Sequence, residues 1–270
     1  MKFTPRKARN DVNVSKEHPL VEATTLVAGL GLILAIVLVV LIFLVDVVLY
    51  FVPEEKEVAL FSSWLPDDIA TVAYDDPRLE KLDYLLGRLS RHWPESKYEL
   101  RVEINDSAEM NALALPGGLI VVTSGLLEKV QTENELAFVL GHELGHFKNR
   151  DHIRGMGRGV VIALLFAALS SSEGSSVVGS SIADLTLRGF SRRQESAADR
   201  FGLKIVHDEY GHVAETWRFF ERISVGDRKS SILGPYLSTH PLSESRIEDI
   251  VEYAGANGWS INGDAVPIDW

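Results

Sequence analysis

Two histidines four positions apart are the residues of this sequence best suited to chemistry. The segment Leu136–His146 has the composition of an apolar helix and contains His142, Glu143 and His146. In a helix, residues i and i+4 lie on one face about a turn apart, so both imidazoles can reach one metal ion. Glu143 projects about 100° further round the helix, where its carboxylate can take a proton from a water molecule beside that ion.

This H-E-x-x-H spacing is typical of zinc-dependent peptidases. A five-residue pattern with two free positions can also arise by chance, and a buried helix with two unrelated histidines is the alternative interpretation. A catalytic zinc site needs three protein ligands and one open position. The remainder of the sequence must therefore supply a third ligand.

A second acidic pair offers that ligand. Glu195 and Asp199 are again four residues apart, on a predicted helix that begins near Phe190 and has small residues between the two acids. We predict that Glu195 is the third ligand and that Asp199, one turn away, accepts the second ring N–H of a histidine ligand. The alternative is a solvated helix face on which these acids alternate with arginines, namely Arg192, Arg193 and Arg200.

Composition narrows the class of protein. The chain has 270 residues, 46% of them hydrophobic and 24% charged, which are globular values and leave room for one domain with an appendage. Its formal net charge of −11 argues against nucleic acid as a partner, because a phosphate-binding surface needs a basic excess. The sequence has no cysteine, so histidines and carboxylates must hold any metal.

One segment has the length and composition of a membrane anchor. Leu26–Val45 contains no charged residue, and twenty helical residues extend roughly 30 Å, the thickness of a hydrocarbon core. A cleaved signal peptide is the alternative, but the apolar run continues past Asp46 to Val52 without a small-residue cleavage pattern. We therefore predict an uncleaved transmembrane anchor over residues 26–52.

The charges that flank this segment predict its orientation. Five basic residues precede it, whereas Lys56 is the only basic residue between the anchor and Arg78. By the positive-inside rule, residues 1–25 form a basic cytoplasmic N-terminus, and the rest of the chain lies outside the cytoplasm. We expect a single-pass inner (cytoplasmic) membrane protein with a linker over residues 53–74 and an extracytoplasmic, periplasmic domain over residues 75–270.

The domain is predicted to be α+β and mostly helical. Besides the histidine helix, which Thr132 and Glu135 open as a capping box, the patterns predict helices over 78–93, 124–130, 160–169 and 213–223, and one that carries Arg246. Residues 98–104 alternate as a half-buried strand. The Ser/Gly-rich segment 170–181 is expected to be a loop, either an idle one or a lid over the site.

Residues 111–123 are predicted to form two short strands joined or bent at Pro-Gly-Gly. Proline is tolerated in a sheet only at an edge, a bulge or a turn. An edge strand beside the histidine helix would offer unpaired backbone groups to an extended peptide. A plain hairpin turn explains the same residues equally well. On the first interpretation the substrate-binding residues are Asn111, Ala112, Leu113, Ala114, Pro116, Gly117 and Gly118.

Taken in order, these motifs resemble the M48 zinc metallopeptidases. The resemblance covers roughly residues 75–250 and rests on Asn111–Gly118, His142–His146, Arg192–Asp199, and Ser238–Pro241 followed by Arg246. The family includes the CAAX prenyl protease, the membrane heat-shock protease and periplasmic proteases of outer-membrane quality control. It implies a zincin-like (gluzincin) domain with a small sheet beside the histidine helix.

The resemblance also implies roles for single residues. One zinc ion per chain would be held by His142, His146 and Glu195, with Asp199 as the partner of a ligand. His240 and Arg246 would lie near the site and stabilise the tetrahedral intermediate, and Glu143 would be the general base.

Two departures from the family pattern shape the expected function. The prenyl and heat-shock branches have several membrane spans where this sequence has one, and the periplasmic branch often adds a helical-repeat domain or a lipid anchor, neither of which is seen here. We expect a membrane-anchored zinc metalloendopeptidase that hydrolyses polypeptide substrates in envelope protein quality control. The alternative is a catalytically silent, chaperone-like binding factor on a peptidase fold.

Overall fold

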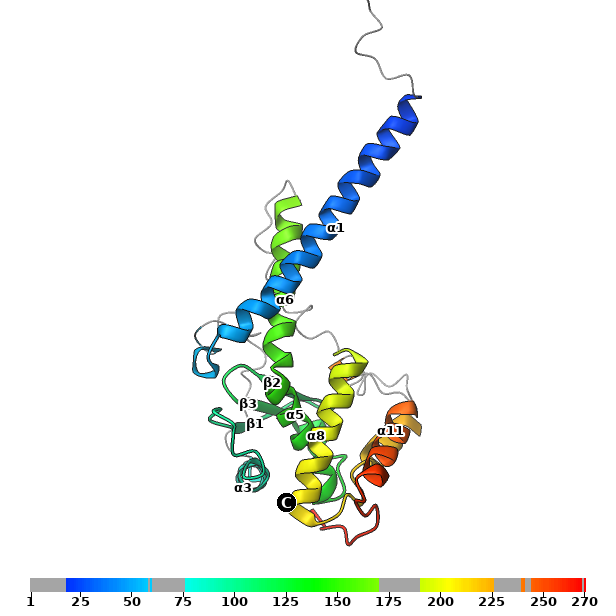
Figure 1. Ribbon diagram of the computed structural model, residues 1–270. Coiled ribbons are helices and arrows are strands. Elements are labelled where there is room, and N and C mark those ends of the chain that lie inside the picture. Colours follow the sequence, from blue (N-terminus) through cyan, green and yellow to red (C-terminus); the bar gives the residue numbers. More distant parts are fainter. Residues whose placement is uncertain are drawn as a thin grey trace, which may run out of the picture. The chain divides into compact units, whose positions relative to one another are not determined.

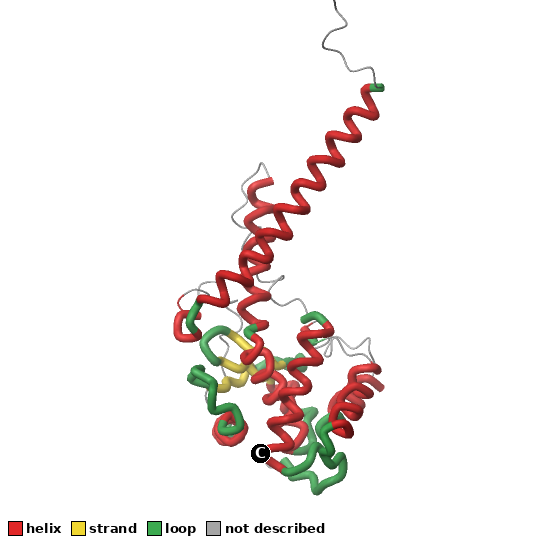
Figure 2. The backbone as a smooth tube through the Cα atoms, in the orientation of Figure 1, coloured by secondary structure: helices red, strands yellow, loops and turns green. Residues whose placement is uncertain are grey.

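A computed structural model of the chain describes residues 18–57, 59, 76–169, 190–225, 239–240, 244–268 and 270 (Figures 1 and 2). Contacts divide the chain into two compact units, with the boundary between Leu44 and Val45. The second unit contains every predicted site residue and begins earlier than residue 75, where the sequence placed the start of the domain. The 53–74 linker and its domain boundary stay predictions, since most of that segment lies outside the described residues.

The first unit consists of the greater part of helix α1 (Pro19–Phe51). Within the described ranges, α1 alone is long and apolar enough to cross a membrane. Its apolar side chains are exposed over most of its length: Leu26 and Phe43, for example, are 69% and 67% exposed. So continuous an apolar surface is typical of a segment that does not face water. The apolar helix predicted from the sequence is therefore present.

The second unit contains a three-stranded sheet in the order β1-β3-β2 (yellow in Figure 2). β1 (Arg101–Asn105) runs parallel to β3 (Leu119–Thr123), and β2 (Ala112–Leu115) runs antiparallel to β3. Pro116-Gly117-Gly118 forms the β2–β3 turn, and both glycines have positive φ angles near 80°, which glycine adopts without steric cost. Among the described strands, β2 is thus an edge strand joined to β3 by a hairpin, so the edge-strand and hairpin interpretations of this segment are compatible.

Helix α5 (Glu133–Asn149) is the histidine helix, and every residue from Asn134 to Phe147 is buried. α5 and α8 (Arg192–Tyr210) lie side by side in Figure 1. Glycines allow this close approach, since a Cβ on Gly145 would lie 2.7 Å from the Cα of Ala198. The other helices in the described ranges are η1 (Glu54–Lys56), α3 (Arg78–Ser90), α4 (Ser124–Leu127), α6 (Asp151–Leu169), α9 (Arg218–Val225) and α11 (Glu244–Ala256).

Two helix predictions need correction. α6 begins at Asp151 and not at residue 160, so three glycines that were expected to precede the helix lie inside it. One of them, Gly157, faces Val45 and Leu49 so closely that a Cβ there would lie 2.8 Å from a methyl carbon of Val45. The helix predicted over 213–223 begins only at Arg218. The segment 170–181, with its lid alternative, lies outside the described residues.

The N-terminus of α5 is capped largely as predicted. The Thr132 hydroxyl accepts a hydrogen bond from the backbone N–H of Glu135 at 3.2 Å. The Glu135 carboxylate accepts from the N–H of Gln131 at 2.8 Å, one residue earlier than a capping box requires. Glu135 is 1% exposed and forms an ion pair with Arg222 at 2.6 Å, which draws the carboxylate away from the regular position.

Candidate metal centre

Four buried side chains from three parts of the chain converge at one point. The ligand atoms of His142 and His146 on α5, Glu195 on α8 and His240 all lie within 4.8 Å of one another. The Nε2 atoms of the two α5 histidines are 3.1 Å apart. Glu195 lies 3.7 Å from Nε2 of His142 and 3.5 Å from Nε2 of His146. The helical spacing places His142 and His146 on one face of α5, and the packing of α8 against α5 brings Glu195 to them.

The second ring nitrogen of each α5 histidine contacts a carboxylate. Nδ1 of His142 lies 2.9 Å from Asp199, and Nδ1 of His146 lies 3.0 Å from Asp151. A carboxylate accepts the Nδ1–H, which leaves the Nε2 lone pair free to point into the site. Asp199 therefore occupies the place that its predicted role requires.

The residues present fit a zinc ion. In a tetrahedral site with Zn–N distances near 2.0–2.1 Å, neighbouring ligand atoms are about 3.3 Å apart. The donor spacings of 3.1 to 3.7 Å among His142, His146 and Glu195 are close to that value. Two buried imidazoles that contact further acids, together with one buried carboxylate that contacts Arg246, form a ligand set typical of catalytic zinc.

The two histidines differ in protonation when no metal is bound. Burial lowers the pKa of His142, so this ring stays neutral. Burial also opposes the charge on His146, but hydrogen bonds with Asp151 and Glu195 outweigh it and raise the pKa of His146 to about 9. Metal binding must therefore displace a proton from His146, as is usual for histidine ligands.

Glu143 is fully buried beside this cluster. Within the described part of the chain, neither oxygen of its carboxylate has a hydrogen-bond partner. Nε2 of His240 lies 3.5 Å from one of its oxygens. A buried carboxylate without a partner is costly and uncommon, and it is typical of a group that acts on a bound molecule.

His240 lies closer to the centre than the sequence analysis suggested. Its Nδ1 is 3.2 Å from Nε2 of His142 and 3.2 Å from Glu195. This nitrogen is therefore a fourth potential metal ligand. The preceding residue, Thr239, donates a hydrogen bond to the side chain of Asn111 at 3.3 Å. His240 is thereby held next to the start of the β2 edge.

Arg246 faces the two acids of α8. Its Nε and Nη2 lie 2.6 and 2.7 Å from the carboxylate oxygens of Asp199, and Nη1 lies 2.6 Å from Glu195. Burial opposes the charge on Asp199, but the Arg246 guanidinium holds the pKa of that carboxyl below its ordinary value. This geometry favours a role in orienting the two acids over the predicted contact with a reaction intermediate.

Sequence reasoning missed two residues of the site. Gln194 donates to Asp151 at 2.7 Å and forms a capping box with Ser191 at the start of α8. Asp151 in turn binds His146, five residues earlier. Asp151 is an acid shortly after the second histidine, and this position could have indicated a partner for His146. It was overlooked because Asp151 follows the predicted end of the helix.

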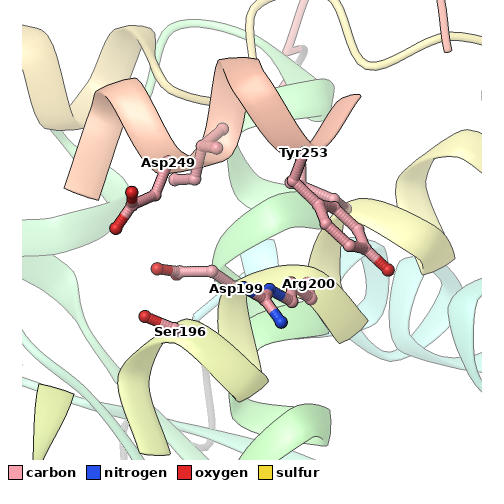
Figure 3. Close-up of a pocket in the computed structure, with 7 residues that line it drawn as sticks. Ser196, Asp199, Arg200, Asp249 and Tyr253 are labelled. Carbon is pink, nitrogen blue, oxygen red and sulfur yellow. The ribbon is translucent and has the colours of Figure 1, made fainter. Parts of the chain in front are cut away.

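A small pocket lies between α8 and α11 (Figure 3). Asp199 lines it, but none of the four potential metal donors does. The pocket therefore borders Asp199 and not the four potential metal ligands. Its lining residues are Ser196, Asp199, Arg200, Leu203, Asp249, Ile250 and Tyr253.

The fold and this ligand set define a zincin-like metallopeptidase site. A family model described as Peptidase family M48 matches residues 84–254. The chain belongs to peptidase family M48.

Curated relatives agree with this assignment. The chain is 28% identical over 190 residues to the mitochondrial metalloendopeptidase OMA1 of Saccharomyces cerevisiae, covering 68% of this chain and 52% of that protein. It is 31% identical over 193 residues to a putative beta-barrel assembly-enhancing protease of Vibrio cholerae, covering 67% and 40%. With the beta-barrel assembly-enhancing protease of Escherichia coli it shares 30% identity over 189 residues, covering 65% and 39%. The chain thus spans about half or less of these relatives' lengths.

Proposed function

We propose that this protein is a membrane-anchored zinc endopeptidase that cleaves polypeptides at the outer face of the cytoplasmic membrane. The observation that carries the proposal is the convergence of His142, His146 and Glu195 beside the buried, unpartnered carboxylate of Glu143. A binding factor that does not cut peptides has no need of such a carboxylate. This arrangement therefore favours catalysis over the chaperone-like alternative.

The reaction is metal-assisted peptide hydrolysis. A zinc ion held by His142, His146 and Glu195 supplies Lewis-acid chemistry for the scissile carbonyl and the attacking water. Glu143 takes the proton of that water and delivers it to the leaving amine. His240 lies 3.5 Å from Glu143 through its Nε2 and can donate to the developing oxyanion. Arg246 holds Glu195 and Asp199 in place.

The outer edge of β2 is the proposed substrate site. β2 pairs only with β3 among the described strands, which leaves its other edge available to an extended peptide. Asn111, the residue directly before β2, accepts a hydrogen bond from Thr239, the residue directly before His240. The edge therefore starts beside the proposed metal centre. The proposed contacts run from Asn111 through Ala112, Leu113 and Ala114 to Pro116, Gly117 and Gly118.

Replacing Glu143 tests the proposal. Glu143→Gln removes the base and keeps the size of the side chain, so we expect wild-type zinc content and a loss of casein cleavage of about 10²- to 10⁴-fold. Glu128→Gln, an exposed change nearby in the chain, is the matched control and should cleave normally. A chelator should abolish wild-type cleavage and added zinc should restore it. Cleavage by Glu143→Gln at the wild-type rate would refute the base assignment.

We further propose that the N-terminus is cytoplasmic and that the catalytic domain lies outside. The support is the basic excess before α1, together with the names of the bacterial relatives, which refer to beta-barrel assembly. Added protease should digest the catalytic domain in spheroplasts without lysis. A domain that stays protected until the membrane is opened would contradict this orientation.

Quality control of envelope proteins is the proposed role. The inactive Glu143→Gln variant should hold its substrates, since binding is kept while turnover is lost. Proteomics of material that co-purifies with this variant, compared with wild type and with Glu128→Gln, should be enriched in unfolded envelope proteins. Enrichment of cytoplasmic proteins alone would contradict the proposed role.

A further inference from the structure

Glu57 lies just after the anchor helix, yet its side chain is fully buried in the catalytic unit. Its carboxylate accepts hydrogen bonds from the Tyr98 hydroxyl at 2.7 Å and from Arg150 at 2.9 and 3.2 Å. Nε2 of His152 lies 3.0 Å away and the N–H of Gly117 lies 3.4 Å away. These five residues, Glu57, Tyr98, Gly117, Arg150 and His152, are called the Glu57 cluster below.

The cluster carries a buried charge that its neighbours stabilise. Burial opposes ionisation, but hydrogen bonds from His152, Tyr98 and Arg150 hold the pKa of Glu57 below its ordinary value. Replacing a buried acceptor of this kind leaves several donors without a partner, which costs far more than a single exposed hydrogen bond. Each donor lies on a different element, so Glu57 fixes their positions relative to one another.

One of these donors, Arg150, lies at the end of the histidine helix, and His152 lies in the first turn of α6. Arg150 is the C-cap of α5 in the left-handed conformation, and its backbone N–H reaches the carbonyls of His146 and Phe147. This conformation is unfavourable for a non-glycine residue, so the contacts of the Arg150 side chain help to maintain it. Its guanidinium binds Glu57 and also the carbonyls of Leu49 and Val52, at 2.9 and 2.7 Å, at the end of the anchor helix.

Aromatic packing connects the Glu57 cluster to the residue next to His146, a proposed metal ligand. Phe147, the residue after His146, packs its ring 5.0 Å from that of Tyr98 and 4.7 Å from that of His152. Both of these rings are hydrogen-bonded to Glu57. The position of Phe147, and with it the last turn of α5, therefore depends on the cluster.

The third contact reaches the proposed substrate edge. Gly117 lies in the turn that ends β2, and its N–H points to the Glu57 carboxylate. A single carboxylate thus contacts the end of the helix that carries His146 and the turn of the strand that would receive a peptide.

We propose that Glu57 is a positioning residue of the peptidase, one that aligns the substrate edge with the histidine helix from the first residues outside the membrane anchor. The inference rests on the proposed function, because alignment of these elements matters for cleavage of an extended peptide. It adds a requirement that the motifs do not contain: a residue just after the anchor helix, Glu57, supports the working site.

The test uses the full chain in detergent micelles with zinc. Glu57→Gln keeps the size of the side chain and removes its charge, and Glu55→Gln, an exposed change two residues earlier, is the matched control. Tyr98→Phe removes one hydrogen bond to Glu57 and keeps the ring, so it is a milder variant should Glu57→Gln fold poorly. We measure kcat and KM on an extended peptide, zinc affinity, and amide hydrogen exchange by mass spectrometry.

For Glu57→Gln we expect kcat/KM to fall by about tenfold or more, and amide exchange to rise in peptides over 115–119 and 144–152, but not over α11. Tyr98→Phe should give smaller changes in the same places, and Glu55→Gln none. Wild-type exchange and kinetics in Glu57→Gln would overturn the proposal, as would exchange that rises equally throughout the domain. If wild type cleaves no peptide, the proposed function fails, and the local exchange still decides whether Glu57 aligns these elements.

Discussion

Asp151 accepts a hydrogen bond from Nδ1 of His146 at 3.0 Å, although the two residues belong to different helices. The same carboxylate accepts from Gln194 at 2.7 Å, and Gln194 directly precedes Glu195, the proposed third ligand. Asp151 is 1% exposed, so these contacts are shielded from water. One side chain therefore links the helix that carries the histidines to the helix that carries the acidic ligand.

This link predicts a loss of zinc affinity in Asp151→Asn. An amide can accept the Nδ1–H only weakly and can present its own N–H group to the ring, which disturbs the tautomer that points Nε2 at the metal. We expect zinc affinity to fall by about 10- to 100-fold, the usual effect of losing such a partner. Competition with a chromophoric chelator measures it. Asp83→Asn, exposed on α3, is the control, and equal affinities in the two variants would exclude this role for Asp151.

The crossing of α5 and α8 predicts that Gly145 cannot accept a larger side chain. A Cβ there would lie 2.7 Å from the Cα of Ala198, whereas a Cβ on Gly155 in α6 would have no neighbour within 4 Å. We expect Gly145→Val to separate the two helices, lower stability by about 1–3 kcal/mol or more, and weaken zinc binding, since Asp199 follows Ala198 directly.

Gly155→Val is the matched control for this change. Valine has a higher helix propensity than glycine, so we expect stability to be unchanged or slightly higher, with normal zinc binding. Thermal denaturation of both variants, with and without zinc, makes the comparison. If Gly145→Val melts at the wild-type temperature, the close crossing does not limit this position.

Local periodicity explains why much of the site could be predicted. His142 and His146, and likewise Glu195 and Asp199, are four residues apart, so a helix alone places each pair on one face. The hairpin at Pro116–Gly118 follows from the turn preferences of its own residues. Membership of family M48, which these motifs suggested, is confirmed by the family model.

Contacts between residues distant in sequence could not be predicted in this way. Glu57 meets its partners 41 to 95 residues later. The early start of α6 was missed because its glycines have a low helix propensity, while the packing of Gly157 against the end of α1 is visible only in the folded chain. Asp151 was missed because the left-handed cap at Arg150, and not helical periodicity, brings it back to His146.

The contacts of Arg246 predict which properties of the protein Arg246→Lys will impair. A lysine provides one point charge and cannot bind Asp199 through two nitrogens while also reaching Glu195. If Arg246 orients these acids, zinc affinity and thermal stability should both fall. If it instead stabilises the reaction intermediate, kcat should fall while zinc affinity stays at the wild-type value. Arg200→Lys, exposed on the same helix as the acids, is the control for charge and size.

A network far from the metal predicts a pH-dependent stability. The Glu209 carboxylate binds Arg88 and His92, each at 2.7 Å, and joins α8 to α3 and the residues after it. Burial opposes the charge on Glu209, but hydrogen bonds from His92 and Arg88 lower the pKa of Glu209 below its ordinary value of 4.5. The folded state therefore binds the proton of Glu209 less tightly than the unfolded chain does.

It follows that Glu209 stabilises the fold fully above pH 4.5 and that this contribution is lost as the pH falls through the lower folded pKa. Glu209→Gln should melt below wild type at pH 7, and the difference in melting temperature should shrink steadily below pH 4.5. Glu252→Gln, an exposed change on α11, should show no such trend. A difference between Glu209→Gln and wild type that stays constant from pH 7 to pH 3 would show that the ionised carboxylate does not support the network.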